Sequence, residues 1–177
     1  MIKEGPPVVR TKTRLLKRLA EQGEVVSQDA NIQVFIDGLR VSPNWISERR
    51  LAFALPAGGQ EIALCSNVFI PGRTLAESAD PRELGLCIGR LQIDGSDAEL
   101  DSEAFDAPGW HEAEFANGRF SRRWTSGATP IPPGARIVIV DLAGVGYYWR
   151  RSDDRGGGAD GSSSSLVGSQ KEPPGGR

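Results

Sequence analysis

The segment Gly109 to Thr129 gathers the residue types best suited to ligand binding or catalysis. It reads GWHEAEFANGRFSRRWTSGAT and holds two of the four tryptophans of the chain together with its one histidine. A tryptophan beside carboxylates and guanidinium groups suits a sugar, because the indole faces the ring C–H groups while the charged groups bind hydroxyls in pairs. The candidate ligand-binding residues are therefore Trp110, His111, Glu112, Glu114, Arg122 and Trp124.

The same segment also fits a purely structural hairpin. Asn117-Gly118 is typical of a tight turn, so the residues on either side are expected to pair as two strands. Glu114 would then meet Arg119 or Arg122 across the pair, and such a surface ion pair contributes about 0–1 kcal/mol. Because tryptophan is normally buried over most of its area, the residue types alone favour the structural role over the ligand site.

The segment does not predict an enzyme. His111 has carboxylates nearby, but the chain offers it no GxSxG motif and no cysteine partner as a nucleophile. Glycoside hydrolysis needs two carboxylates about 5–9.5 Å apart in a cleft, and Glu112 and Glu114 would meet that condition only by coincidence. We therefore expect no catalytic residue and no cofactor.

Metal binding is not expected either. The acidic stretch DGSDAELDSE, from Asp94 to Glu103, lacks the EF-hand spacing and is better interpreted as a solvated turn than as a calcium site. Cys65 and Cys87 lie in apolar, strand-like contexts, and with a single histidine they are too few for a structural zinc site. Free buried thiols are the favoured interpretation, and a disulfide is the alternative.

Length and composition bound the class of protein. A chain of 177 residues accommodates one domain of ordinary size with arms at its ends. No apolar run approaches the roughly 20 residues that cross a bilayer, and the basic N-terminus lacks the pattern of a secretory signal, so a cytoplasmic location is the default expectation. The net charge of −2 argues against a nucleic-acid binder driven by its overall field.

The two ends of the chain differ from its middle. Residues 1–30 form a basic arm, in which Thr11 to Gln22 is expected to be a short helix that Gly23 ends. Leu15, Leu16 and Leu19 gather on one side of this helix. An anionic partner such as nucleic acid or lipid head groups would suit the arm, but a solvated linker or docking helix is favoured because no aromatic residue is interleaved. Residues 152–177 are rich in Gly, Ser and Pro, which predicts a disordered tail.

Between the arms, residues 31–151 show the period of two that is typical of strands. Asp37-Gly38 and Asp94-Gly95 are hairpin-turn dipeptides. The apolar run RIVIVDL, residues 136–142, predicts a strand covered on both faces, and Tyr147 to Trp149 is expected to close the domain. Eight to ten short strands without intervening helices predict an antiparallel β-sandwich of immunoglobulin-like or jelly-roll type. Further strands are expected at residues 31–36, 51–55, 61–66 and 84–93.

Residues 31–149 also resemble a known type of domain. The run LGLCIGRLQIDG and the later Gly-Trp-His, Glu and Arg-Trp-Thr block resemble a β-sandwich found C-terminal to bacterial Hint (intein-like) domains and in glycosyltransferase-associated proteins. The resemblance implies an accessory module that is often suspected of engaging carbohydrate. The chain lacks the N-terminal nucleophile block and the partnering histidine of Hint domains, so self-processing is not expected.

Together these observations predict a non-catalytic binding module, with bacterial surface carbohydrate as the leading ligand class. The alternative is a structural or assembly protein that forms a homo-oligomer or particle through sandwich contacts and its arms. A protein partner is compatible with either, whereas nucleic acid and a membrane span are not expected.

Overall fold

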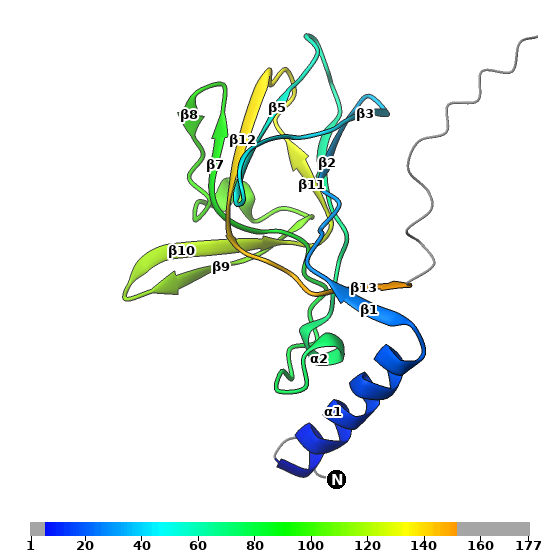
Figure 1. Cartoon of the computed structure of the whole chain (residues 1–177). Helices are drawn as coiled ribbons and strands as arrows, with labels where there is room; N and C mark the ends of the chain where they lie inside the picture. The colour runs from blue at the N-terminus through cyan, green and yellow to red at the C-terminus, as the bar shows by residue number, and fades with distance from the viewer. Residues whose placement is uncertain (1–5, 152–177) are drawn as a thin grey trace, which may run out of the picture.

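The computed structural model describes residues 6–151 and shows an all-β sandwich preceded by one helix (Figure 1), which confirms the predicted fold class. The larger sheet has the order β4-β5-β12-β7-β10-β9, with β8 paired to β7, and the smaller one has the order β11-β6-β2-β3. All strand pairs are antiparallel. The strands of the larger sheet are β4 (Asn44–Ser47), β5 (Arg50–Ala54), β7 (Cys87–Ile93), β8 (Ser96–Asp97), β9 (Trp110–Ala116), β10 (Arg119–Thr125) and β12 (Ile137–Gly144). Those of the smaller sheet are β2 (Gln33–Ile36), β3 (Leu39–Val41), β6 (Ile62–Cys65) and β11 (Ala128–Ile131).

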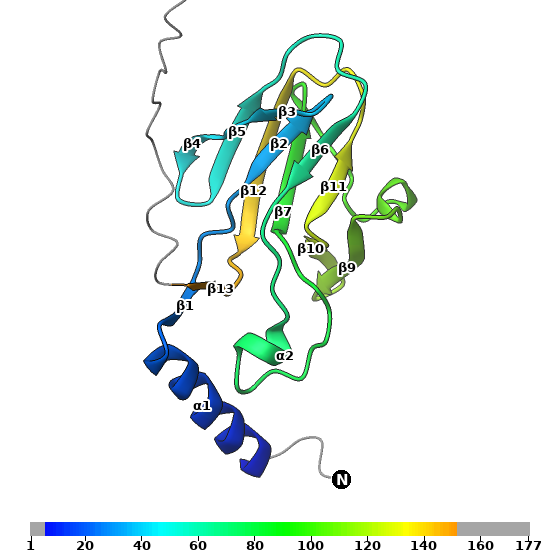
Figure 2. The same ribbon diagram turned by 90° about the vertical axis from the view of Figure 1, so that its right-hand side faces the viewer.

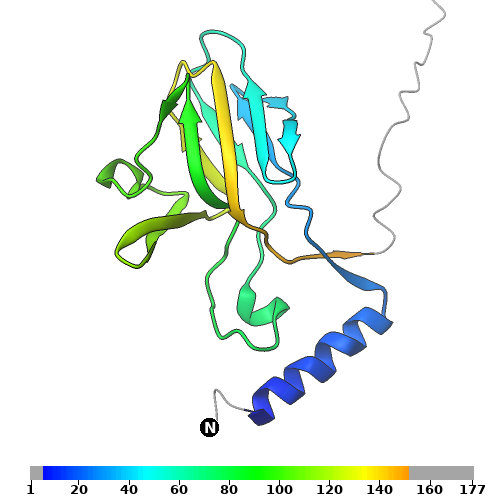
Figure 3. The same cartoon turned by 60° about the vertical axis from the view of Figure 1, so that its left-hand side comes forward.

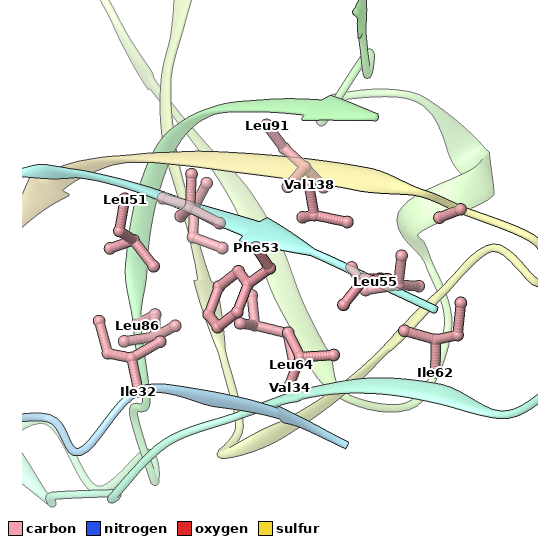
Figure 4. Close-up of a cluster of buried hydrophobic side chains, with 14 of the residues drawn as sticks. Ile32, Val34, Leu51, Phe53, Leu55, Ile62, Leu64, Leu86, Leu91 and Val138 are labelled. Atoms are coloured by element: carbon pink, nitrogen blue, oxygen red, sulfur yellow. The ribbon is translucent and has the colours of Figure 1, made fainter. Parts of the chain in front are cut away.

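The core lies between the two sheets, because its buried residues come from strands of both. The strands of the two sheets overlap in the view of Figure 2. Leu51 and Phe53 of β5 and Val138 of β12 point toward Val34 of β2 and Leu64 of β6 (Figure 4), and all five side chains are almost fully buried. The alternation of apolar and polar residues along these strands places one side chain in two on the inner face. Each such side chain contributes about 1.5–3 kcal/mol by leaving water, so this layer is the main source of stability.

The predicted Asp-Gly turns are present and also link strands that are distant in sequence. Asp37-Gly38 and Asp94-Gly95 have positive φ at both positions, as a type I′ turn requires. The Asp94 carboxylate accepts hydrogen bonds from the backbone N–H groups of Arg136 at 2.9 Å and Ile137 at 2.8 Å. Part of the predicted acidic turn therefore holds the start of β12 in place.

The prediction that residues 136–142 are covered on both faces is wrong. Val138 and Val140 are fully buried, but Ile137 on the opposite face is 50% exposed and Ile139 is only half-buried. The outer face of the larger sheet has no described helix or sheet packed along β12, so its apolar residues there meet solvent. Both faces of the run are apolar, and the sequence pattern alone does not distinguish them.

The N-terminal helix is longer than predicted. Helix α1 spans Pro6–Glu21 rather than residues 11–22, because proline fits the first turn of a helix, where its missing N–H costs nothing. Strand β1 (Glu24–Ser27), which was not predicted, pairs with β13 (Tyr148–Arg151) in a separate two-stranded ribbon. The segment expected to close the domain thus pairs with the basic arm, while its Tyr148 side chain is buried against Phe69 and Leu84 of the sandwich domain. The predicted tail at 152–177 lies outside the described residues.

Two short helical segments lie in the connections. Helix α2 (Pro71–Thr74) follows β6, and a 3₁₀ turn, η1 (Glu103–Phe105), precedes β9. The β9–β10 hairpin projects beyond the sandwich (Figures 1 and 3). In both figures, helix α1 is joined to the end of the β1–β13 ribbon that lies farther from the sandwich. No helix in the described part of the chain is both long and apolar enough to cross a membrane.

Candidate functional site

The β9–β10 hairpin confirms the turn predicted at Asn117-Gly118, where both residues have positive φ. Two register shifts interrupt the pairing, one between Phe120 and Arg122 and one between Arg123 and Thr125. A bulge adds a residue to one strand and so changes which side chains share a face. As a result Phe120 packs against the core from one face of the hairpin, while Arg122 pairs with Glu114 on the other.

The charged side chains on this outer face form a chain of ion pairs, which we call the hairpin network: Asp80, Arg82, Glu114 and Arg122. Glu114 accepts from Arg122 Nε at 2.7 Å and from Arg82 Nη2 at 3.3 Å, and Arg82 also pairs with Asp80 at 2.8 Å. The predicted pairing of Glu114 with Arg122 is therefore confirmed. Asp80 and Arg82 come from the connection between α2 and β7, so the network fastens that loop to the hairpin.

The network shifts the ionisation of its members. The hydrogen bond from Arg82 is the main cause that lowers the pKa of the Asp80 carboxyl, and burial opposes it. The hydrogen bond to Glu114 is the main cause that raises the pKa of the Arg122 guanidinium. The outer face therefore presents alternating charges rather than a patch of one sign.

A pH-dependent stability is expected from Asp80. Because folding lowers the pKa of this carboxyl, its contribution is fully present above the unfolded value of about 3.9 and is lost as the pH falls through the folded value. The Asp80→Asn variant should therefore lose less than about 1 kcal/mol of unfolding free energy at pH 7, since the pair is partly exposed, and less than that at about pH 2. Urea denaturation at both pH values measures this. An equal loss at both pH values would contradict the prediction, and the exposed Asp101→Asn serves as control.

His111 and Glu112 are placed differently from each other. His111 Nε2 lies 2.7 Å from the carbonyl oxygen of Glu83, which makes that nitrogen the protonated donor, and ties the hairpin to the same loop as the network. Glu112 is exposed and has no ionic or hydrogen-bonding partner within residues 6–151. Neither side chain has a hydrogen bond to a serine or cysteine in this part of the chain.

The two predicted tryptophans are half-buried in separate aromatic clusters. Trp110 packs edge-on against Phe105 at a centroid distance of 5.0 Å and touches the main core. Trp124 packs edge-on against Phe69 at 5.8 Å, beside Tyr148. The structure thus brings Glu114, Arg122 and Trp124 to one face, and places Trp110 on the other. Whether these residues bind a ligand remains a prediction.

Adjacent arginines have opposite environments. Arg122 is exposed, whereas Arg123 is only 2% exposed and is the largest of the fully buried side chains. Its guanidinium donates to the carbonyl oxygens of His111 at 2.6 Å and Leu100 at 2.8 Å and pairs with the Asp106 carboxylate. Arg123 therefore holds the η1 region against the hairpin from the inside.

The most exposed tryptophan with a neighbouring cavity is Trp45, which sequence analysis did not select. Trp45 lies on the edge strand β4 and is 54% exposed. It borders a cavity of about 100 Å³, here called the Trp45 pocket, whose exposed rim includes Gln28, Asp29 and Glu48. One signal was present in the sequence: Trp45 lies in the polar setting PNWISE, which is unusual for a buried tryptophan.

The floor of the Trp45 pocket is apolar. Ile32 and Leu86 are buried there, together with Cys87 and Tyr148. Burial raises the pKa of the Cys87 thiol to about 11, so it is protonated at neutral pH. Burial likewise raises the pKa of Tyr148 to about 12, and its hydroxyl donates to the carbonyl oxygen of Gly85 at 2.9 Å. The floor therefore offers contact surface rather than reactive groups.

Both cysteines are free thiols, as predicted, although Cys65 is only half-buried. Within the described residues, no three His, Cys, Asp or Glu side chains lie close enough together to hold a metal ion. In the predicted acidic turn, Asp97 instead pairs with Arg90 at 2.8 Å.

Comparisons with protein-family models, curated proteins and solved structures found no match. The resemblance to Hint-associated sandwiches therefore stays a prediction, and function has to be argued from the surfaces described above.

Proposed function

We propose that this chain is a non-catalytic binding module for carbohydrate and that the Trp45 pocket is its binding site. The observation that carries the proposal is an exposed indole next to a cavity with an apolar floor and a rim that bears carboxylates. Sugars need this combination, because one face of the ring is apolar while its edge carries hydroxyl groups.

The exposed Glu48 carboxylate on the rim supplies hydrogen-bond acceptors for those hydroxyls. Asp29 Oδ1 accepts the backbone N–H of Asn31 at 2.8 Å, which fixes the orientation of a second rim carboxylate. Glu48 lies just beyond the strand that carries Trp45, and it lines the same pocket. A site held in place before binding loses little conformational entropy when the ligand arrives.

The size of the cavity narrows the ligand class. At about 100 Å³ it is smaller than the roughly 300–1,000 Å³ of sites that enclose a whole small molecule, so it takes one substituent. Because the floor consists of apolar side chains such as Ile32 and Leu86, a methyl group is the substituent that fits best. The proposed ligands are therefore N-acetylated or 6-deoxy sugars, which stack on Trp45 and insert their methyl group.

The hairpin network is the weaker candidate for this role. Both oxygens of Glu114 are already paired with arginines, and Trp124 packs against Phe69. A sugar hydroxyl there would compete with these internal contacts. We infer that the network mainly holds the hairpin against the α2–β7 connection.

The test is to titrate the protein with N-acetylglucosamine, fucose, glucose and glucosamine and to measure binding from the shifts of its two-dimensional NMR spectrum. The wild type should bind the two methyl-bearing sugars more tightly than the other two. Trp45→Ala should weaken this binding at least about tenfold, which corresponds to about 1.4 kcal/mol, while the fold is retained because the side chain is exposed. Ile46→Ala, an equally exposed neighbour on β4, should leave binding unchanged and is the matched control.

Other results would redirect the proposal. Loss of binding in a folded Trp124→Ala variant, with Trp45→Ala unaffected, would move the site to the hairpin. If none of the four sugars binds, the pocket proposal is contradicted. A concentration-dependent mass in light scattering under the same conditions would favour the assembly alternative.

A further inference from the structure

Helix α1 has an amphipathic face that the rest of the described chain does not bury. None of its residues is buried, and Leu15 and Leu19 are 57% and 37% exposed. Val8, Leu15 and Leu19 follow helical spacing along one side of the helix, with Val9 and Leu16 beside them. Val8, Val9 and Leu16 are half-buried, so the part of the stripe that is available to a surface outside the fold is the one that carries Leu15 and Leu19.

The polar side of the same helix is strongly basic. The helix carries five basic side chains and one acidic one, although the whole chain has a net charge of −2. Arg14, Lys17 and Arg18 line one shallow hollow together with Thr11, Leu15 and the single acidic residue Glu21, so a net positive charge adjoins apolar surface. The preferred partner of α1 is therefore anionic and also offers an apolar layer.

The anchoring of α1 leaves this surface accessible. Lys12 donates from Nζ to the carbonyl oxygen of Ser78 at 2.6 Å, which ties the helix to the α2–β7 connection. The sandwich lies away from the helix in all three ribbon views (Figures 1–3). After the turn at Gly23, Val25 and Val26 of β1 are also about 40% exposed, which adds apolar surface next to the helix.

We propose that α1 docks this protein on a membrane surface rich in anionic lipid, lying in the interface rather than across it. Helices of this kind carry a polar face rich in lysine and arginine opposite a narrow apolar side, which inserts at the head-group level. Two weak contributions to binding add here: the lysine and arginine side chains attract anionic lipid, and Leu15 and Leu19 insert where the head groups meet the acyl chains. Nucleic acid is the less favoured polyanion, because α1 contains no aromatic side chain to stack on bases.

The experiment uses the full chain and vesicles of phosphatidylcholine with or without phosphatidylserine, with binding measured by co-sedimentation. The wild type should bind only the vesicles with phosphatidylserine. Raising the ionic strength from about 0.1 M to about 1 M shortens the Debye length from about 10 Å to about 3 Å and should release it. Binding that is equal on both kinds of vesicle would overturn the proposal.

Two variants separate the electrostatic and apolar contributions. Arg14→Gln/Lys17→Gln/Arg18→Gln should reduce the partition coefficient more than tenfold. Leu15→Ala/Leu19→Ala should also reduce it several-fold while keeping helicity, because alanine is the best helix former. Far-UV circular dichroism checks that the variants are folded. The charge-matched control Arg40→Gln/Arg119→Gln/Arg136→Gln changes three exposed arginines on the sandwich and should bind like the wild type.

The remaining outcomes each decide against the proposal. If the control loses binding as much as the helix variant, attraction depends on total charge and not on α1. Binding to a single-stranded oligonucleotide but to neither type of vesicle would make α1 a nucleic-acid contact. Self-association that requires Leu15 and Leu19, without vesicle binding, would make α1 a contact between copies of this chain.

Discussion

Replacing Arg123 with alanine should lower the free energy of unfolding by about 3–5 kcal/mol, because it leaves two carbonyl acceptors unpaired and a volume unfilled. The substitution removes a side chain that is 2% exposed and leaves the carbonyl oxygens of Leu100 and His111 without their donor. Each unpaired buried acceptor costs about 1–3 kcal/mol, and the vacated volume adds to that. Urea denaturation followed by circular dichroism measures the loss.

The neighbouring residue provides the control. Arg122→Ala removes an equal charge from the same strand, but the side chain is exposed and its ion pair with Glu114 contributes at most about 1 kcal/mol. The prediction is contradicted if the two variants are destabilised equally. Arg123→Lys retains the charge but not the three separately directed donors, and it should recover only part of the stability.

The sequence does not determine which of Arg122 and Arg123 is buried. Alternation along a strand predicts that neighbours face opposite sides. It does not say which one faces inward, and the register shifts on either side of these arginines depend on pairing with β9. Arginine is seldom fully buried, so the residue type alone predicts an exposed side chain. The burial of Arg123 depends on acceptors such as the Leu100 carbonyl oxygen, which comes from a distant segment.

The parts of the fold that were predicted correctly rest on local chemistry. The turns at Asp37-Gly38, Asp94-Gly95 and Asn117-Gly118 need positive φ at two successive residues, and few dipeptides supply it. Strands next to these turns followed from the apolar alternation. By contrast β11 contains Pro130, which sequence patterns count against a strand, and it is tolerated because β11 is an edge strand.

The candidate sites were predictable to different degrees. The pairing of Glu114 with Arg122 follows from the hairpin register and was predicted. Arg82 and Asp80 also belong to the network, but they lie in a loop about thirty residues before Glu114 in the sequence. No local sequence pattern indicates that contact. The Trp45 pocket combines four separate stretches of the chain, so the sequence could suggest an exposed Trp45 but not the cavity beside it.

Gly109→Ala should be the most disruptive single-methyl change near the hairpin, lowering the free energy of unfolding by about 2–4 kcal/mol. Gly109 has φ of +100°, and a Cβ there would lie 2.5 Å from the carbonyl oxygen of Ala128 and 3.0 Å from Thr129 Cα. These are backbone atoms of β11, which cannot rotate away as a side chain would. The Gly109 carbonyl also accepts the hydroxyl of Thr129 at 2.9 Å, so movement of this residue breaks a further contact.

Gly118→Ala is the control for Gly109→Ala, because it has the cost of an unfavourable backbone conformation without the steric conflict. Gly118 also has positive φ, +72°, but nothing lies within 4 Å of a Cβ there. Its substitution should cost only about 1–2 kcal/mol, the intrinsic penalty of the left-handed conformation. Equal losses would show that β11 does not restrain the start of β9. A larger loss for Gly109→Ala, with NMR shifts that extend from the hairpin into β11, would show that close packing at Gly109 joins the hairpin to the smaller sheet.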